Sequence, residues 1–384
     1  MRVYLLLLLL LGGCAIVPSP PPVTPPPSPT AATPVLKPAD WPQLPGWADS
    51  DALASWPVFL NNCAVLKKKP DWQAVCSAAA AFTPQDDRQA RDFFERWLSP
   101  QQLVANDGRD SGLITGYYEP LLFGSRQPSE RFRFPIHGVP DDMLSIDLSS
   151  VYPELKTYRL RGRLDGNKVV PYFNRAEIEA GRAPLAGREL LWVDDAVDLF
   201  FLQIQGSGRV QLENGETVRI GYADQNGHPY VSIGKKLVEQ GELKLEQASM
   251  QGIKQWGERN PEKLIPLLNH NASYVFFREL PPSAINSSGG PPGALGLPLT
   301  AGRSLAVDPR AVALGSPVYL ATTWPNSAQP LNRLMLAQDT GGAIKGAIRA
   351  DFFWGFGDEA GKLAGSMRQQ GQIWVLLPRG QVQP

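Results

Sequence analysis

The stretch AQDTGGAIKGAIRADFFWG, residues 337–355, places two aspartates on either side of a glycine-rich turn. Asp339 ends an apolar run, Lys345 lies in the turn, and Asp351 lies in an apolar and aromatic segment typical of a β-strand. Four interpretations fit: a reactive carboxylate pair, the DTG of an aspartic peptidase, a phosphate loop, or a structural turn. The order GxxxxGK[ST] is absent, which argues against the phosphate loop.

The two aspartates have different predicted surroundings. Asp339, before Thr-Gly-Gly, can accept backbone N–H groups and stay ionised, which suits a structural or binding role. Alternation along a strand places Phe353 on the face of Asp351, and burial beside aromatic rings would raise the pKa of Asp351, as a general acid requires. Arg349 falls on the same face, where its charge would lower that pKa. The sequence leaves this conflict open, and a plain surface pair of Asp351 with Arg349 is the alternative.

The first residues have the features of an export signal. Residues 1–13 hold one arginine and a leucine run that is too short to span a membrane as a helix. Leu11-Gly12-Gly13-Cys14 resembles a bacterial lipobox, which implies cleavage before Cys14 and acylation of its thiol. Ala15 follows the cysteine, and by analogy this predicts lipid anchoring on the periplasmic side of the outer membrane. The alternative is a secretory peptide with an incidental cysteine.

A proline-rich linker follows the cysteine, and we assign residues 14–37 to the lipidated cysteine and this linker. Residues 18–34 read PSPPPVTPPPSPTAATP, which predicts an extended polyproline spacer. At about 3.1 Å per residue, the spacer would hold the folded part roughly 50 Å from the bilayer. That reach suits a target fixed near the membrane, such as the cell wall.

Composition narrows the class of partner. The chain has 37 basic and 37 acidic residues and no long charged run, which argues against a nucleic-acid partner. With Cys14 assigned to the lipid, Cys63 and Cys76 remain of 3 cysteines. In an oxidising compartment they are candidates for a disulfide, with two buried free thiols as the alternative.

After the linker the chain is long enough for two domains. Thr83 as N-cap and Pro84 at the first helical position predict a helix over residues 83–98. Short β-like runs begin at Gly112, and Asn214-Gly215 predicts a type I′ hairpin. Three helices, the first capped by Ser232, are expected up to about residue 270, and strands fill the last third.

Few residues are suited to other kinds of chemistry. The 3 histidines, His137, His228 and His270, have no metal-ligand spacing, so neither a metal site nor a histidine triad is expected. GxSxG is also absent, and the sequence indicates no cofactor. Carboxylates remain as the expected tools of an exported protein that faces polysaccharide.

Several motifs resemble those of one family. AVDPRAVALGSPVYL with Asp308, AQDTGGAIKG with Asp339, and the strand with Asp351 resemble the 3D domain, named for three aspartates. TGYYEP, QIQGSGRV, GYADQNGHPYVSIGK and NASYVFFRE occur upstream in the order found in membrane-bound lytic murein transglycosylase A. The combination spans most of residues 112–378 and is highly specific, although each motif alone is weak.

The resemblance implies a mainly β fold with helices. It predicts a double-psi β-barrel built from residues 38–120 and 281–384, which include the 3D segment. A second, smaller β-barrel, residues 121–280, would be inserted between these two parts. A glycan strand of peptidoglycan would lie in a groove between the domains.

The resemblance also implies a mechanism with one catalytic aspartate, Asp351. It would protonate the glycosidic oxygen between N-acetylmuramic acid and N-acetylglucosamine, then act as base on the C6 hydroxyl that closes a 1,6-anhydro ring. An intramolecular hydroxyl removes the need for the second carboxylate of a hydrolase. Asp339 and Lys345 would support the site. Further residues predicted to contact substrate are Thr115, Tyr117, Gln205, Gly206 and Gly208.

Alternatives remain open at this stage. An aspartic peptidase needs two facing aspartates that share a proton, and no second DTG or DSG occurs in the chain. A wall-binding lipoprotein without activity and a hydrolytic glycosidase are the others. Participation in a cell-wall synthesis complex is left open by the sequence.

Overall fold

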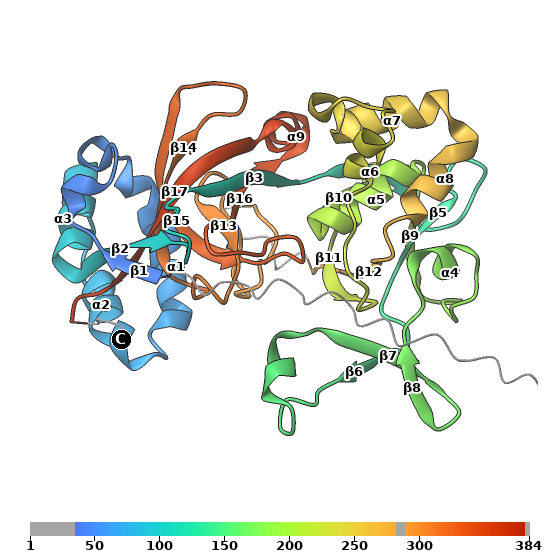
Figure 1. Ribbon diagram of the computed structural model, residues 1–384, viewed down its shortest axis with the longest axis horizontal. Coiled ribbons are helices and arrows are strands. Elements are labelled where there is room, and N and C mark those ends of the chain that lie inside the picture. Colours follow the sequence, from blue (N-terminus) through green and yellow to red (C-terminus); the bar gives the residue numbers. More distant parts are fainter. Residues whose placement is uncertain (1–34, 282–288, 381–384) are drawn as a thin grey trace, which may run out of the picture. The chain divides into compact units, whose positions relative to one another are not determined.

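A computed structural model describes residues 35–281 and 289–380 of the chain (Figure 1). The predicted signal peptide, Cys14 and the proline-rich stretch 18–34 lie outside the described residues. Within the described part, no helix combines the length and the apolar character needed to cross a bilayer.

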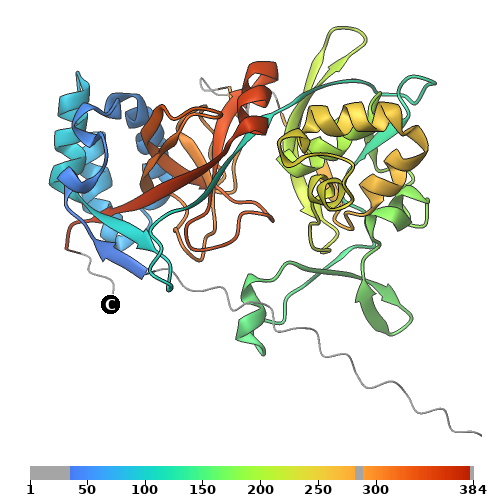
Figure 2. The same ribbon diagram turned by 45° about the horizontal axis from the view of Figure 1, so that its top comes forward.

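The first sheet has eight strands in the order β1-β2-β17-β14-β15-β13-β16-β3. Because β3 also pairs with β17, the six strands from β17 to β3 form a closed ring. Figure 2 shows β3, in teal, beside the orange and red strands of the last third. The strands are β1 (Val35–Pro38), β2 (Leu98–Val104), β3 (Gly112–Glu119), β13 (Ser304–Val307), β14 (Pro317–Thr323), β15 (Pro330–Asp339), β16 (Ala350–Phe356) and β17 (Arg368–Pro378).

The ring is filled by apolar side chains from strands far apart in sequence, among them Ile114, Leu305, Phe352 and Ile373. Strand β1 adds an edge by pairing with β2, so residues 35–37, assigned to the linker from sequence, belong to this sheet. Pro38 is tolerated because β1 is an edge strand, and the next N–H, that of Ala39, donates to the carbonyl of Pro100 at 3.1 Å.

Three helices pack against the first sheet: α1 (Trp56–Leu66), α2 (Pro70–Ala80) and α3 (Asp87–Trp97). Their aromatic side chains share a core with Tyr319 and Trp374 of the sheet. A disulfide joins Cys63 of α1 to Cys76 of α2, with the Cα atoms 5.4 Å apart. A bridge that closes a loop of this length stabilises a fold by about 2–4 kcal/mol.

The predicted start of the third helix is wrong by three residues. Helix α3 begins after Asp86, whose carboxylate accepts the backbone N–H of Gln89 at 2.7 Å, and not after Thr83. Asp87 then accepts the N–H of Leu53 at 2.9 Å, which ties the helix to the preceding segment. Aspartate is a strong N-cap, which explains why the helix begins after Asp86. The next residue, Asp87, adds the tertiary contact.

A second sheet has the strand order β12-β11-β10-β4-β9-β5. A single bridge between Gly138 and Phe277 brings the chain after β5 to β12. The strands are β4 (Leu121–Ser125), β5 (Phe134–His137), β9 (Glu189–Val193), β10 (Ser207–Leu212), β11 (Thr217–Gln225) and β12 (Val275–Glu279). The chain enters this sheet immediately after β3, at Pro120, and leaves it after β12.

The remaining elements surround these sheets. A three-stranded sheet consists of β6 (Leu144–Ile146), β7 (Leu160–Asp165) and β8 (Lys168–Pro171). The helices are α4 (Arg175–Glu179), α5 (Ala196–Gln205), α6 (Ile233–Glu239), α7 (Met250–Arg259), α8 (Pro261–Asn269) and α9 (Gly357–Ser366). The 3₁₀ helices are 41–43, 47–49, 52–55, 153–157 and 245–247. The mainly β character with helices, predicted from sequence, is therefore confirmed.

The hairpin at Asn214-Gly215 is present, but its turn is not type I′. Strands β10 and β11 pair as predicted, and the N–H of Leu212 donates to the carbonyl of Glu216 at 2.8 Å. Type I′ needs positive φ at both central residues, whereas only Gly215 has it, at 84°. Asn214 instead accepts the N–H of Glu216 through its side chain. A left-handed glycine of this kind closes a bulged loop of three residues.

Candidate active site

Parallel pairing of β3 with β16 places Thr115 opposite Asp351. Phe352, the next residue of β16, points into the core of the ring, whereas Phe353 packs with Tyr117 in a separate cluster. The two faces predicted for this strand are therefore confirmed. Asp351 lies on the face of Phe353 and Tyr117, outside the core of the ring.

Asp351 is held by one hydrogen bond from a side chain that is itself held by an arginine. The Thr115 hydroxyl donates to Oδ1 of Asp351 at 2.5 Å and accepts from Nη2 of Arg349 at 2.8 Å. Within the described residues, Oδ2 of Asp351 has no hydrogen-bond partner. This oxygen can therefore carry a proton that no protein group competes for.

Burial and the neighbouring groups shift the pKa of Asp351 in opposite directions. Burial raises the pKa of Asp351, while the charge of Arg349 and the Thr115 hydrogen bond lower it, and the net shift is upward. The charge of Arg349 acts directly on the carboxylate, and its guanidinium also donates to the Thr115 hydroxyl and to the carbonyl of Ala350. The conflict left open by the sequence is thereby resolved in favour of burial.

Asp339 ends β15 and is surrounded by donors. Its Oδ1 accepts the backbone N–H groups of Ala294 and Thr340, each at 2.9 Å, and its Oδ2 accepts the Tyr117 hydroxyl at 3.1 Å. Burial nevertheless raises the pKa of Asp339 to about 6, and the nearby charge of Asp351 adds to the rise. Sequence reasoning correctly anticipated the backbone donors but missed the burial, which outweighs them.

The two raised pKa values make both carboxylates candidates for the acid, and geometry distinguishes them. Both oxygens of Asp339 already accept hydrogen bonds, whereas Oδ2 of Asp351 is free of them within the described residues. A proton on Oδ2 of Asp339 would share that oxygen with the Tyr117 hydroxyl. Asp351 is therefore the carboxyl group better arranged to transfer a proton to a ligand.

Tyr117 supports Asp339 and does not present an open ring. The side chain is 7% exposed, and its ring centroid lies 5.1 Å from that of Phe353. In the structure this side chain packs against Phe353 and donates a hydrogen bond to Asp339, and its predicted contact with substrate stays a prediction. Its position two residues after Thr115 puts both hydroxyls on one face of β3.

The third aspartate, Asp308, has a structural environment. It is 2% exposed, pairs with Arg310 at 2.6 Å and accepts the backbone N–H of Gly346 at 2.9 Å. These contacts fasten the loop 340–349 between the other two aspartates. Lys345 precedes Gly346 and is exposed. The limited desolvation of its ammonium group still lowers the pKa of that group.

The three remaining predicted contact residues lie where the second sheet meets β3. The side-chain oxygen of Gln205 accepts the N–H of Tyr118 at 3.1 Å. Gly206 ends α5 with φ 79°, in the left-handed conformation that suits glycine. At Gly208 a Cβ atom would lie 2.5 Å from Leu202 and 3.2 Å from the carbonyl of Pro120. Each residue thus has a structural function, and contact with substrate stays a prediction.

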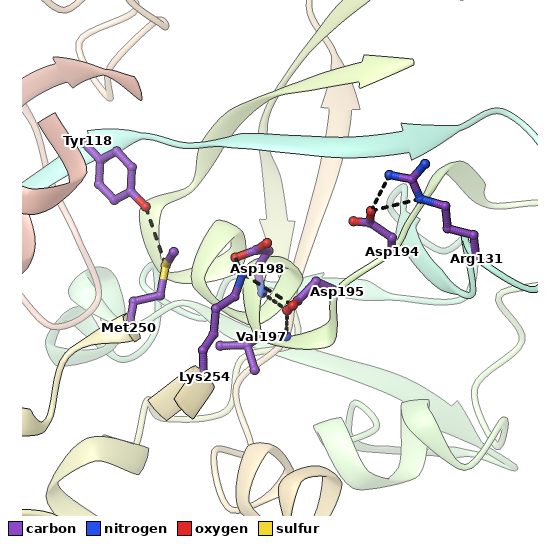
Figure 3. A network of polar contacts seen from close by, with 8 residues as sticks. All are labelled: Tyr118, Arg131, Asp194, Asp195, Val197, Asp198, Met250 and Lys254. Carbon is purple, nitrogen blue, oxygen red and sulfur yellow. Dashed lines mark hydrogen bonds and ion pairs between the residues drawn. The ribbon is translucent and has the colours of Figure 1, made fainter. Parts of the chain in front are cut away.

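The other face of β3 contacts the helices that cover the second sheet (Figure 3). The Tyr118 hydroxyl lies 3.5 Å from the sulfur of Met250 in α7. Lys254 of the same helix pairs with Asp198 at 2.7 Å and Asp195 at 3.4 Å, at the first turn of α5. Asp195 also caps that helix. None of these residues was a candidate from sequence, since their local pattern is that of ordinary helix ends.

Comparison with known proteins matches two family models to this chain. The MltA specific insert domain matches residues 113–278, and the 3D domain matches residues 303–377. The membrane-bound lytic murein transglycosylase A of Escherichia coli strain K12 is 33% identical over 300 residues, which cover 76% of this chain and 72% of that protein.

Solved structures show the same likeness. The crystal structure of MltA from Neisseria gonorrhoeae in its monoclinic form has 43% identity and a TM-score of 0.77, and the match covers 92% of this chain and 97% of that one. E. coli MltA with bound chitohexaose has 26% identity and a TM-score of 0.65, with 91% and 96% covered. The motif order, the fold and these relatives agree, and the chain belongs to the membrane-bound lytic murein transglycosylase A family.

Proposed function

We propose that this protein is a lytic transglycosylase that cleaves the β-1,4 bond between N-acetylmuramic acid and N-acetylglucosamine in peptidoglycan and forms 1,6-anhydromuramoyl products. Membership of the family supports the activity. The assignment of Asp351 as the general acid is supported by its raised pKa and by its Oδ2 atom, which has no protein donor within the described residues. The chitohexaose bound to E. coli MltA supports a glycan ligand.

The proposed reaction uses Asp351 twice. Protonated Asp351 gives its proton to the glycosidic oxygen as the bond from that oxygen to C1 of the muramic residue breaks. The C6 hydroxyl of the same residue then attacks C1 and returns a proton to Asp351, so no water is consumed. The Thr115 hydrogen bond stabilises the ionised form between these steps.

Asp339 has the surroundings of a supporting charge. Positive charge develops at C1 while the bond breaks, and a fixed carboxylate in a buried site stabilises it. Two backbone N–H groups and Tyr117 hold this carboxylate in place before substrate binds. Lys345, exposed in the neighbouring loop, would bind polar groups of the sugar.

The two sheets are proposed to be the two barrels expected of the family. The closed ring of six strands would be the double-psi β-barrel, formed from residues 38–120 and 281–384. The second sheet would be the smaller barrel of residues 121–280, with the bridge from Gly138 to Phe277 near its closure. In this assignment the glycan strand lies in a groove between the domains.

Arg349 offers a test of the acid that can be read from the pH profile. Arg349→Gln removes the charge that lowers the pKa of Asp351 and keeps a donor for Thr115. A higher pKa keeps the acid protonated to higher pH, so the alkaline limb of kcat/KM should move up by about 0.5–1 pH unit. Arg131→Gln, at an exposed pair with Asp194, is the control. An unmoved or lowered limb would contradict the assignment.

The proposed location is the periplasmic face of the outer membrane, through a lipid on Cys14. The sequence motif around Cys14 and the name of the relatives, which are membrane-bound, support it. Cys14→Ala should release an active protein from the membrane fraction. Loss of membrane association without any change in the acylation of Cys14 would contradict the anchor.

Mass spectrometry of products from purified peptidoglycan tests the function itself. Anhydro-ended muropeptides identify a lytic transglycosylase, reducing ends a hydrolase, and an unchanged sacculus a wall-binding protein without activity. Cleavage of stem peptides would instead support an aspartic peptidase. The separate donors of Asp339 and Asp351 do not favour that last outcome, because a peptidase dyad shares one proton.

A further inference from the structure

Glu119, the last residue of β3, is completely buried and lies between two arginines of the second sheet. Its Oε1 accepts from Nη2 of Arg219 at 2.8 Å, and its Oε2 accepts from Nε of Arg209 at 2.9 Å. Arg209 and Arg219 face each other across β10 and β11, where like charges repel. The carboxylate of Glu119 therefore compensates both cations from the end of a strand in the first sheet.

The same face of β3 carries Thr115, Tyr117 and Glu119, because alternate residues of a strand point the same way. Thr115 binds Asp351, Tyr117 binds Asp339, and Glu119 binds the arginines. One face of a single strand thus connects both active-site carboxylates to the second sheet.

Arg209 has two further contacts, both with segments that lead to the active site. Its guanidinium lies 3.7 Å from the ring centroid of Phe356, the last residue of the strand that carries Asp351. It also donates to the carbonyl of Gly289 at 3.0 Å, five residues before Ala294, whose N–H binds Asp339. The planar fork of an arginine can make all these contacts at once, whereas a lysine cannot.

We infer that Arg209, held by Glu119, is a positioning residue that fixes the segments of Asp351 and Asp339 relative to the second sheet, across the groove proposed for the glycan. A buried group of two arginines and one glutamate is poor evidence of net stability, since desolvation offsets the attraction. Its clear effect is geometric, because it ties the end of β16 and the segment before Ala294 to β10. The inference rests on the proposed lytic activity.

The test compares Arg209→Lys with the wild type on purified peptidoglycan. The variant keeps the charge but loses the fork, and we expect kcat to fall about 10-fold to 100-fold, as small misplacements of reacting groups do. The Kd of chitohexaose, measured with Asp351→Asn as common background, should change less than about twofold. Arg126→Lys, just after β4 at an exposed pair with Glu279 of β12, should match the wild type in both.

Phe356→Leu provides a second variant in which folding is not at risk, because Phe356 is 42% exposed. It removes the ring beneath Arg209, and a smaller fall in kcat with unchanged Kd is expected. Wild-type kcat in both variants would overturn the inference. The inference would also be overturned if the fall in kcat of Arg209→Lys were no larger than the fall in its folded fraction, measured by thermal melts. Absence of anhydro products from the wild type would instead refute the proposed function.

Discussion

Asp351→Asn is expected to lower turnover on peptidoglycan by about 10²–10⁴-fold, the range that a general acid contributes. The amide has the shape of the carboxyl group and can still accept from Thr115 through its oxygen, so the strand and its hydrogen bond persist. It cannot supply a proton at neutral pH or take one from the C6 hydroxyl. Because one residue serves both steps, the loss should lie at the upper end of the range. Release of anhydromuropeptides, followed by mass spectrometry, measures it.

Binding distinguishes a chemical defect from a structural one. The Asp351→Asn variant should bind chitohexaose within about twofold of the wild type, since proton transfer is lost and shape is kept. Asp147→Asn, at an exposed carboxylate directly after β6, is the matched control and should retain full turnover. A near wild-type rate in the Asp351 variant would refute the mechanism and would transfer the role of acid to Asp339.

The parts of the fold that sequence predicted are those with a local signal. The strands of the last third show alternating or apolar runs, and the helix after Ser232 has a capping side chain that accepts the N–H of Lys235. The motif order then identified the family. Together they predicted the strand of Asp351, its two faces and a supporting role for Asp339.

Other elements lack such a signal. Helix α1, WPVFLNNCAVL, and helix α5, AVDLFFLQIQ, are apolar on most sides because they are buried, so no stripe of period 3.6 stands out. Helix α9, GDEAGKLAGS, contains three glycines, which are poor helix formers. Tertiary packing decides these segments, and a single sequence does not display it.

Contacts between residues far apart in the sequence could not be predicted either. The bond from Thr115 to Asp351 joins positions 236 residues apart, and its existence depends on the parallel register of β3 and β16. The family motifs indicated Gln205, Gly206 and Gly208 as groove residues, yet their contacts are with Tyr118, helix α5 and Pro120. A motif identifies important positions, but only the contacts show what each one does.

Asp339→Asn should lower turnover less than Asp351→Asn, by about 10-fold to 100-fold, because it removes a stabilising charge and leaves the acid in place. The amide oxygen can accept the N–H groups of Ala294 and Thr340, and its NH₂ can donate to the Tyr117 hydroxyl. The site should therefore keep its shape. Equal losses in the two variants would mean that the division of roles is wrong.

The same substitution should stabilise the folded protein at neutral pH. The pKa of Asp339 is about 6 in the folded state, against 3.8 for an ordinary exposed aspartate, so the folded state holds its proton more tightly. Stability contributed by that proton is present below about pH 4 and is lost as the pH rises through about 6. Asp339→Asn avoids the loss, which amounts to at most about 3 kcal/mol. Its melting temperature should exceed that of the wild type at about pH 7.5 and approach it at about pH 4. A wild type that melts higher at the upper pH would show that the buried charge is compensated by its donors, and that Asp339 stabilises the fold as well as the reaction.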